Sequence, residues 1–344
     1  MKPQENVSLS NYSTMRLGGT ADYLVEVHSK TELTTAINWA QERGLPTLMI
    51  GGGSNIYWRD DGFRGLVMVN KIKGYTDQLQ YDGSHLLTIG AGETWDDVVA
   101  RSVEAGLTGI EALSLIPGTA GGTPIQNVGA YGQRISRPLV SVEAFDTQTN
   151  QFVTLANADC AFGYRESRFK TMDRGRFFIT SITLRLEEGD PNPPYYLAVE
   201  DYLTKHPVEG PMTPGKLRAI VIAIRESKLP DPSKVANNGS FFANPIVDAK
   251  TAEKLQTTFP DIPCWPGDDN TYKIPAAWLI ENVGLKGFHD PETGMATWGN
   301  HALVLVNEHA KTTDDLLRFK QHIVNAVQQK FGITLLQEPE MLPH

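Results

Sequence analysis

The residues best suited to hold a charged ligand lie in a glycine-rich stretch, LIPGTAGGTPIQNVGAYG, which covers residues 115–132. It contains five glycines and two prolines in eighteen residues, a composition that disfavours a regular helix or a packed strand. Glycine lets main-chain N–H groups approach a ligand closely, and Gln126, Asn127 and Tyr131 add side-chain donors and acceptors. We therefore predict a ligand-binding loop, with a tight structural crossover as the alternative.

A second glycine motif, GGGSN at residues 51–55, directly follows a predicted strand. Glycines at the carboxyl end of a buried strand form nests of N–H groups that bind phosphates in α/β proteins. The motif itself is only weakly specific. It is not the G-x-G-x-x-G fingerprint, and the following IYWRDDGFRG resembles a strand and turn more than a helix start. A classical dinucleotide-binding Rossmann domain is therefore disfavoured.

Charged side chains that could take part in chemistry occur in two further segments. FGYRESRFK, residues 162–170, carries three basic side chains in nine positions, and a solvated loop is its alternative interpretation. The segment LQEPEML contains two carboxylates, Glu338 and Glu340, on either side of a proline. The two cysteines, Cys160 and Cys264, have neither metal-ligand spacing nor a disulfide framework, so we expect reduced thiols without a catalytic role.

Apolar periodicity predicts the elements that position these segments. Ser29 and Glu32 form a predicted capping box for a helix that Gly44 ends, and Pro214 starts a later helix after Thr213 as its N-cap. Further helices are predicted at residues 94–105, 249–259, 276–287 and 313–331. Strands are predicted at residues 21–27, 46–50, 86–89, 139–145, 151–155, 177–186 and 302–306.

Length and composition narrow the class of protein. A chain of 344 residues exceeds the usual size of one core, so we expect two or three domains. With 40% hydrophobic and 21% charged residues, the chain is typical of a globular protein. A net charge of −9 disfavours a general nucleic-acid or anionic-membrane surface. The N-terminus lacks the apolar core of a signal peptide, and no run reaches 18 apolar residues, so we expect a cytoplasmic protein without membrane insertion.

Seven motifs together carry a family resemblance. PTLMIGGGSN, AGETW, LSLIPGTAGGTPIQNVGAYG, FGYRESRFK, KLPDP, GSFFANP and the terminal EPE occur in this order over nearly the whole chain. The chain resembles the UDP-N-acetylenolpyruvoylglucosamine reductases (MurB), flavoenzymes of bacterial cell-wall synthesis, in their longer, first type. Each motif is weak by itself, whereas seven in the family's order are highly specific.

The resemblance implies an α+β fold. Two subdomains would form an FAD-binding fold of the PCMH/vanillyl-alcohol-oxidase type, and a smaller α+β domain would bind substrate. We place the FAD-binding subdomains at residues 1–75 and 76–206 and the substrate-binding domain at residues 207–310. Residues 311–344 would form a C-terminal helix and a tail that carries Glu340.

The resemblance also implies the activity. FAD would be the bound cofactor and NADPH the co-substrate, and the enolpyruvyl group of UDP-N-acetylglucosamine enolpyruvate would be reduced to give UDP-N-acetylmuramate. NADPH would bind and leave before the UDP-sugar enters. Alternatives are an FAD-dependent oxidase of another alcohol or sugar, and a flavin- or nucleotide-binding module without activity. We expect a monomer with small-molecule partners and neither a metal nor a nucleic-acid ligand.

Three residues match the family's catalytic positions. Arg165 in FGYRE would stabilise the negative charge that develops on the enolate, Ser240 in NGSFF would donate the proton, and Glu340 in EPE would lie near the enolate.

The remaining site residues follow from the same resemblance. The predicted flavin contacts are Ile50, Gly51, Gly52, Gly53, Ser54, Asn55, Pro117, Gly118, Thr119, Gly122, Thr123, Gln126, Asn127, Gly129 and Ala130. The predicted substrate contacts are Tyr131, Tyr196, Lys228, Asn244 and Lys273, with Tyr195 or Tyr202 as alternatives to Tyr196. The chain departs from the family pattern at Ala243, at Trp265 and in TWGNHAL, residues 297–303. These departures concern nucleotide binding and leave the three catalytic positions intact.

Overall fold

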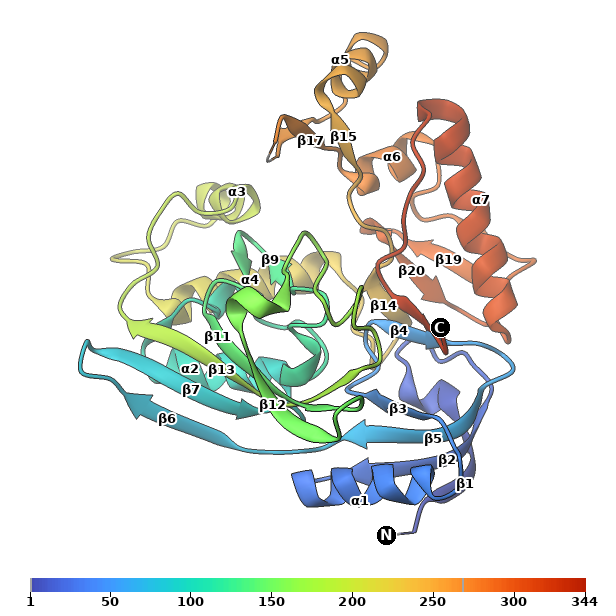
Figure 1. Cartoon of the computed structure of the whole chain (residues 1–344). Coiled ribbons are helices and arrows are strands. Elements are labelled where there is room, and N and C mark those ends of the chain that lie inside the picture. The colour runs from blue at the N-terminus through green and yellow to red at the C-terminus, as the bar shows by residue number, and fades with distance from the viewer. Residues whose placement is uncertain (1, 268) are drawn as a thin grey trace. The chain divides into compact units, whose positions relative to one another are not determined.

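The computed structural model describes residues 2–267 and 269–344, which form two compact units. Each unit is assembled from several segments of the chain, which Figure 1 distinguishes by colour. The first unit comprises the chain up to Val7, Ala21–Gly52 and Arg64–Glu226. The second unit comprises Ser8–Thr20, Gly53–Phe63 and Ser227–His344.

The first unit contains a four-stranded sheet in the order β1-β2-β5-β3. These strands are β1 (Gln4–Ser8), β2 (Thr20–Val27), β5 (Phe63–Asn70) and β3 (Thr47–Ile50). Helix α1 (Lys30–Gln41) buries Leu33 and Ile37 against Leu66 and Met68 of β5. Figure 1 shows α1 lying along this sheet, in agreement with the apolar periodicity that predicts the helix.

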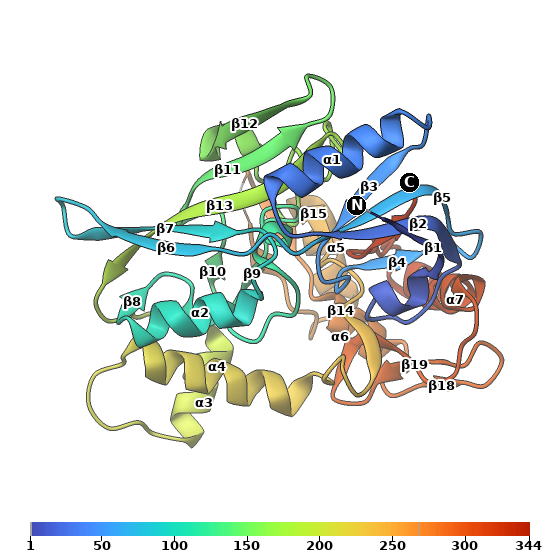
Figure 2. The ribbon, with the colours of Figure 1, turned by 90° about the horizontal axis from the view of Figure 1, so that it is seen from below.

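A larger antiparallel sheet in the same unit has the order β12-β11-β13-β7-β6, with β8 also paired to β13. Its strands are β6 (Tyr75–Leu79), β7 (Ser84–Gly90), β8 (Leu107–Thr108), β11 (Leu139–Asp146), β12 (Gln151–Ala156) and β13 (Phe177–Glu188). Helices α2 (Trp95–Glu104), α3 (Leu197–Lys205) and α4 (Pro214–Lys228) lie on one side of this sheet in Figure 2. Buried Trp95, Val98 and Val99 fix α2 to the sheet.

The second unit surrounds α7 (Thr313–Phe331), whose Phe319, Ile323 and Val327 are fully buried in its main core. Its sheets are β14-β20-β19-β18, β15-β17-β16 and the parallel pair β21-β4. The strands are β4 (Ile56–Trp58), β14 (Ala236–Ser240), β15 (Ile246–Asp248), β16 (Trp265–Pro266), β17 (Thr271–Lys273), β18 (His289–Asp290), β19 (Met295–Trp298), β20 (His301–Asn307) and β21 (Glu340–Leu342). Helices α5 (Ala249–Thr258) and α6 (Ala276–Asn282) complete the unit.

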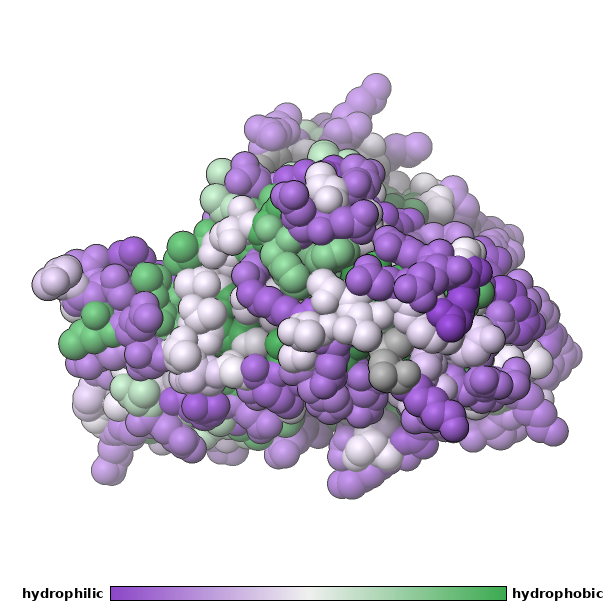
Figure 3. Space-filling view, turned by 60° about the horizontal axis from the view of Figure 1, so that its bottom comes forward, coloured by the Kyte–Doolittle hydropathy of each residue, from purple (hydrophilic) through white to green (hydrophobic). Residues whose placement is uncertain are grey.

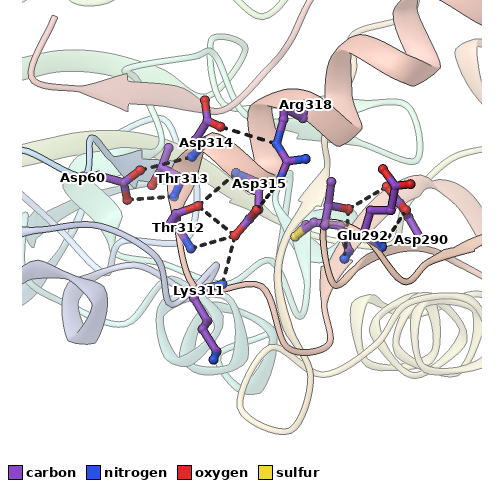
Figure 4. Close-up of polar contacts among 11 residues, drawn as sticks. Asp60, Asp290, Glu292, Lys311, Thr312, Thr313, Asp314, Asp315 and Arg318 are labelled. Carbon is purple, nitrogen blue, oxygen red and sulfur yellow. Dashed lines mark hydrogen bonds and ion pairs between the residues drawn. The ribbon is translucent and has the colours of Figure 1, made fainter.

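The start of α7 is held by acidic side chains, as Figure 4 shows. The Thr312 hydroxyl accepts a hydrogen bond from the Asp315 N–H at 3.2 Å, and the Asp315 carboxylate accepts one from the Thr312 N–H at 3.1 Å. The Asp60 carboxylate accepts from the N–H groups of Thr313 and Asp314 at 2.7 and 3.1 Å. These bonds satisfy helix N–H groups and fix α7 to the segment that follows β4.

The predicted helices and strands are present, with small differences at their ends. Ser29 caps α1 by accepting from the Glu32 N–H at 3.1 Å, but the Glu32 carboxylate accepts from the His28 N–H and not from that of Ser29. The helix predicted at residues 276–287 ends at Asn282, because the chain takes a left-handed turn at Gly284 (φ +77°). Helix α3 was not predicted, since a proline-rich segment precedes it.

Figure 3 shows a face of the molecule on which hydrophilic residues predominate and hydrophobic ones occur in small groups. Within the described residues, no helix combines the length and the apolar character needed to cross a membrane.

Candidate active site

The glycine-rich loop at residues 115–132 packs against the start of α2. The Gly118 carbonyl accepts from the Trp95 N–H at 3.1 Å, and the Ala120 N–H donates to the Glu93 carbonyl at 2.9 Å. Residues Ala120–Gly122 form a single 3-10 turn, η3. Near the end of the loop, β9 (Gly129–Ala130) pairs with β10 (Gln133–Arg134), so main-chain bonds fix the loop at several points.

The two glycine motifs meet at close range within the first unit. A Cβ atom added at Gly51 would lie 2.5 Å from Oγ1 of Thr119, and one added at Gly52 would lie 3.1 Å from Cα of Gly118. The shorter separation is too small for a real Cβ, so any larger residue at position 51 would have to displace the Thr119 side chain. The sequence-predicted turn and loop thus form one surface that is rich in main chain.

The two neighbouring glycines in η3 differ in the space around them. A Cβ at Gly121 would lie 2.6 Å from the Cβ of Ala91, whereas one at Gly122 would meet no atom within 4 Å, and Gly122 is exposed. Gly51 and Gly52 thus pack against Thr119 and Gly118, while Gly122 exposes main chain on the same loop, and bare main-chain N–H groups of this kind suit a pyrophosphate. These residues fit the diphosphate of FAD.

Arg165 is held on the same loop. Its Nη2 donates to the Gly129 carbonyl at 2.8 Å, and the Asn127 amide donates to the Gly163 carbonyl at 2.9 Å. Arg165 adopts a left-handed conformation with φ +57° and is half-buried. The FGYRE segment is thus bound to the glycine-rich loop, and its guanidinium is placed beside the predicted flavin contacts.

Tyr131 and Tyr196, both predicted to contact substrate, also meet in the first unit. Their ring centroids lie 5.9 Å apart in an edge-to-face arrangement. Burial raises the pKa of Tyr131, and the charge of Arg225, together with its hydrogen bond to Tyr131, opposes this effect. Sequence reasoning missed Arg225, a half-buried cation on α4, because a single arginine on an amphipathic helix carries no distinguishing pattern.

The other half of the GGGSN motif lies in the second unit. Gly53 has φ +69°, and an added Cβ would lie 2.3 Å from the Tyr12 carbonyl oxygen, so this position requires glycine. The Ser54 carbonyl accepts from the Asn238 amide at 3.2 Å. The motif is thereby joined to β14, which ends in Ser240.

A β-bulge determines the position of Ser240. The register of β14 against β20 pairs Asn237 with Val306 and Ser240 with Val304, so the strand is irregular between these pairs. Gly239 has φ +70°, and its N–H donates to the Asn237 side chain at 2.8 Å. A bulge redirects side chains out of the regular alternation of a strand, and this one changes the face on which Ser240, the predicted proton donor, lies.

The C-terminal tail lies beside the segment that follows Ser240. The tail pairs with the segment after β14 through an antiparallel bridge between Phe242 and Gln337, and the Glu338 N–H donates to the Phe241 carbonyl at 2.8 Å. Two of the three predicted catalytic residues therefore lie on adjacent segments of the second unit.

Glu340 also contacts the second half of the GGGSN motif. Its N–H donates to the Asn55 carbonyl at 3.0 Å, at the start of the parallel pairing of β21 with β4. The sequence predicted Ser54, Asn55 and Glu340 from separate motifs, and in the structure the Asn238 amide binds the Ser54 carbonyl and the Glu340 N–H binds the Asn55 carbonyl. Sequence reasoning missed Asn238, although its pairing with Gly239 as an N-G dipeptide could have indicated a bulge or turn.

The remaining predicted substrate contacts are distributed over the second unit. The Asn244 side chain accepts from the Ala276 N–H at 3.0 Å at the start of α6. Lys273 ends β17 and is half-buried, and Lys228 is the exposed last residue of α4. The predicted flavin contacts divide between the units, with residues up to Gly52 and residues 117–130 in the first unit and Gly53–Asn55 in the second.

Comparison with known protein families gives two matches, one in the N-terminal and one in the C-terminal part of the sequence. Residues 21–155 match the FAD binding domain model, and residues 231–342 match the C-terminal domain model of UDP-N-acetylenolpyruvoylglucosamine reductase. Proteins named UDP-N-acetylenolpyruvoylglucosamine reductase are 38% identical in Ralstonia nicotianae and 40% identical in Cupriavidus pinatubonensis, each over 97% of both chains. The Pseudomonas aeruginosa protein of the same name is 38% identical over 98% of both chains.

A solved structure supports the fold. The UDP-N-acetylenolpyruvylglucosamine reductase of Thermus caldophilus aligns over 100% of both chains with a TM-score of 0.69 and 24% identity. Fold and matched domains define a flavin-dependent oxidoreductase with an FAD-binding fold of the PCMH type, which confirms the predicted α+β class. Within that class, the chain belongs to the UDP-N-acetylenolpyruvoylglucosamine reductase family.

Proposed function

We propose that this chain uses bound FAD and NADPH to reduce UDP-N-acetylglucosamine enolpyruvate to UDP-N-acetylmuramate in peptidoglycan synthesis. The observation that carries the proposal is the similarity to reductases of this name over 97% of both chains. The alternative of an FAD-dependent oxidase is not favoured, because it would leave the match to the reductase C-terminal domain at residues 231–342 unexplained. The cytoplasmic location, the monomeric state and a link to cell division remain predictions from the sequence.

The main-chain surface of the glycine motifs would hold the cofactor. Six of the fifteen predicted contacts are glycines, whose main-chain N–H groups can approach a charged diphosphate closely. When bound, FAD supplies the hydride carrier between NADPH and the terminal carbon of the enolpyruvyl group. Gln126 and Asn127 would add side-chain hydrogen bonds to this site.

Arg165 would stabilise the charge that develops on the substrate. After the terminal carbon has received a hydride, the electron pair of the double bond spreads into the substrate carboxylate as an enolate. A guanidinium can bind this planar anion with two parallel hydrogen bonds. The bond from Nη2 to Gly129 holds Arg165 in place before substrate arrives, so little reorganisation is needed.

Ser240 would deliver the proton that completes the reduction. Its O–H bond breaks as the proton passes to the carbon beside the substrate carboxylate, and the resulting alkoxide must recover a proton from solvent. Serine is a weak acid, so hydrogen bonds or cations must stabilise the alkoxide. Glu340, on the adjacent segment, would orient the reacting group. Tyr131, Tyr196, Lys228, Asn244 and Lys273 would bind the UDP-sugar.

Anaerobic spectroscopy tests the proposal in two steps. The purified protein should show flavin absorption that is bleached by NADPH and returns when UDP-N-acetylglucosamine enolpyruvate is added. Bleaching without recovery on substrate would retain the flavin site and exclude the proposed acceptor. Protein that neither contains FAD nor takes it up on reconstitution would refute the cofactor assignment.

A further inference from the structure

We propose that His344 is a positioning residue for Glu340, which it holds in a fixed orientation and in its ionised form. Nε2 of His344 lies 3.3 Å from Oε2 of Glu340. The side chain of Glu340 is 15% exposed and that of His344 is 34% exposed, so the pair is shielded from bulk water in large part. The catalytic consequence of this pair rests on the proposed function of Glu340.

The backbone of the tail is arranged so that the two side chains meet. Residues four apart in a continuous strand are separated by about 13 Å, so the chain must turn back after β21 for this contact to form. Arg59 fixes the turn, since its N–H donates to the Leu342 carbonyl at 2.7 Å and its Nε donates to the Pro343 carbonyl at 3.0 Å. The Glu340 N–H is bound to Asn55 at 3.0 Å. Main-chain bonds therefore hold both ends of the segment that carries the pair.

Charged groups of neighbouring elements also lie around the tail, and burial lowers the pKa of one of them, the Lys320 amine. Glu338 lies two residues upstream and is buried, Arg59 follows β4, and Lys320 of α7 donates to the Gln337 side chain at 2.9 Å. Imidazole is the side chain whose charge ordinarily changes between about pH 5 and pH 8. Protonated His344 would stabilise the Glu340 carboxylate by charge and hydrogen bond, and neutral His344 can still donate one N–H. The strength of the pair should thus increase as pH falls through the pKa of the imidazole.

The test measures the pair directly and its effect on each half-reaction. NMR titration of His344 should give a higher imidazole pKa in the wild-type holoenzyme than in Glu340→Gln. In stopped-flow experiments at pH 6, His344→Ala should slow flavin reoxidation by UDP-N-acetylglucosamine enolpyruvate roughly three- to tenfold, the effect of losing one partly buried charged hydrogen bond. His344→Gln, which keeps an N–H donor, should recover part of this loss. Flavin reduction by NADPH should be unchanged in both variants.

A matched control is available in the same unit. His289 and Glu308 form a similar pair at 3.0 Å, but the His289 side chain is 67% exposed. His289→Gln should leave both half-reactions at the wild-type rate.

The outcomes separate this inference from the proposed function. If Glu340→Gln itself reoxidised at the wild-type rate, both the role of Glu340 and that of His344 would be wrong. If Glu340→Gln were slow, but His344→Ala reoxidised normally and the His344 pKa were equal with and without Glu340, only the positioning role would be overturned.

Discussion

At the scale of single residues, Ser240 shows how a side chain is placed by its neighbours. The bulge between Asn237 and Ser240 interrupts the strand alternation, and Asn238 ties the same segment to Ser54 at 3.2 Å. A serine hydroxyl has no intrinsic tendency to donate a proton at neutral pH, so its assigned role depends on this placement.

Replacing Ser240 by alanine should separate the two half-reactions. We expect Ser240→Ala to keep FAD and normal reduction by NADPH, while turnover falls by roughly 10² to 10⁴, the usual effect of losing a general acid. Rapid-scanning absorbance of the flavin measures both steps. The exposed Ser8, replaced by alanine, serves as a control that should retain full turnover. Turnover of Ser240→Ala within twofold of wild type would remove Ser240 from the mechanism.

The two cysteines should differ in reactivity. Cys160 is fully buried, and burial raises the pKa of its thiol to about 11, while the half-buried Cys264 also has a raised pKa. Since the thiolate is the reactive form, labelling of both should increase with pH, and Cys160 should react in the native protein far more slowly than Cys264. Mass spectrometry after timed alkylation at pH 8 measures each site. Equal labelling rates in native protein would contradict the burial of Cys160, and unfolding in urea should equalise them.

The sequence predicts motif residues better than it predicts the side-chain contacts that these residues make in the structure. The sequence identifies Ser240 and Glu340 through short motifs, and the capping role of Ser29 through its spacing from Glu32. It could not predict that Arg225 bonds Tyr131 or that His344 reaches Glu340, because these contacts depend on side-chain directions that no local pattern encodes.

At the scale of elements, the glycine-rich loop combines two requirements in neighbouring positions. Gly121 packs against Ala91 at a distance that excludes a side chain, while Gly122 faces open space. Gly121 therefore allows close packing inside the protein, and Gly122 leaves the main chain of the loop accessible to a ligand.

Two alanine variants should separate these requirements. Gly121→Ala should destabilise the protein without FAD by about 1–3 kcal/mol, because the added methyl group overpacks the contact with Ala91. Gly122→Ala should leave the stability of the apoprotein close to wild type but weaken FAD binding if the flavin lies on this surface. Urea unfolding of apoprotein and fluorescence titration with FAD measure the two effects. Equal stability of the two apoproteins, or FAD binding unchanged in Gly122→Ala, would contradict the respective role.

Elements with strong periodicity or capping were predictable. The helix at residues 313–331 was predicted with the bounds that the structure shows, because its apolar stripe and its first-turn acidic residues agree. Short strands such as β4 and β21 were not predicted as a pair, since three residues hold no period and their partner is distant in sequence. The bulge in β14 was not predicted either, because it depends on the pairing with β20, which is distant in sequence.

At the scale of the whole molecule, removal of the cofactor should lower stability. Ligand that binds only the folded state adds about 2.7 kcal/mol at a concentration of about 100 times its Kd. We expect the melting temperature of the apoprotein to rise with FAD concentration. Riboflavin lacks the diphosphate and should give a much smaller rise, since the glycine surface is suited to phosphates. Differential scanning fluorimetry, using a dye whose emission FAD does not mask, measures both. A rise with riboflavin equal to that with FAD would contradict diphosphate binding.

The division of the chain into units was only partly accessible from sequence. Proline- and glycine-rich segments such as residues 206–215 predict a boundary, whereas the compact units divide after Glu226, inside α4. The sequence did not indicate that Ser8–Thr20 and Gly53–Phe63 belong with the C-terminal part, because membership of a unit depends on contacts between distant segments.

The pairing of β4 with β21 also bears on how the chain is made. Arg59 bonds Pro343, which follows it by 284 residues, so these partners emerge from the ribosome far apart in time. At a synthesis rate of about 5–20 residues per second, the β4 segment waits roughly 15 s to a minute for its neighbour. During that interval an apolar strand edge with buried Tyr57 and Trp58 has no native partner, which makes the nascent chain a substrate for chaperones. The second unit can therefore be completed only after the β21 segment has been synthesised.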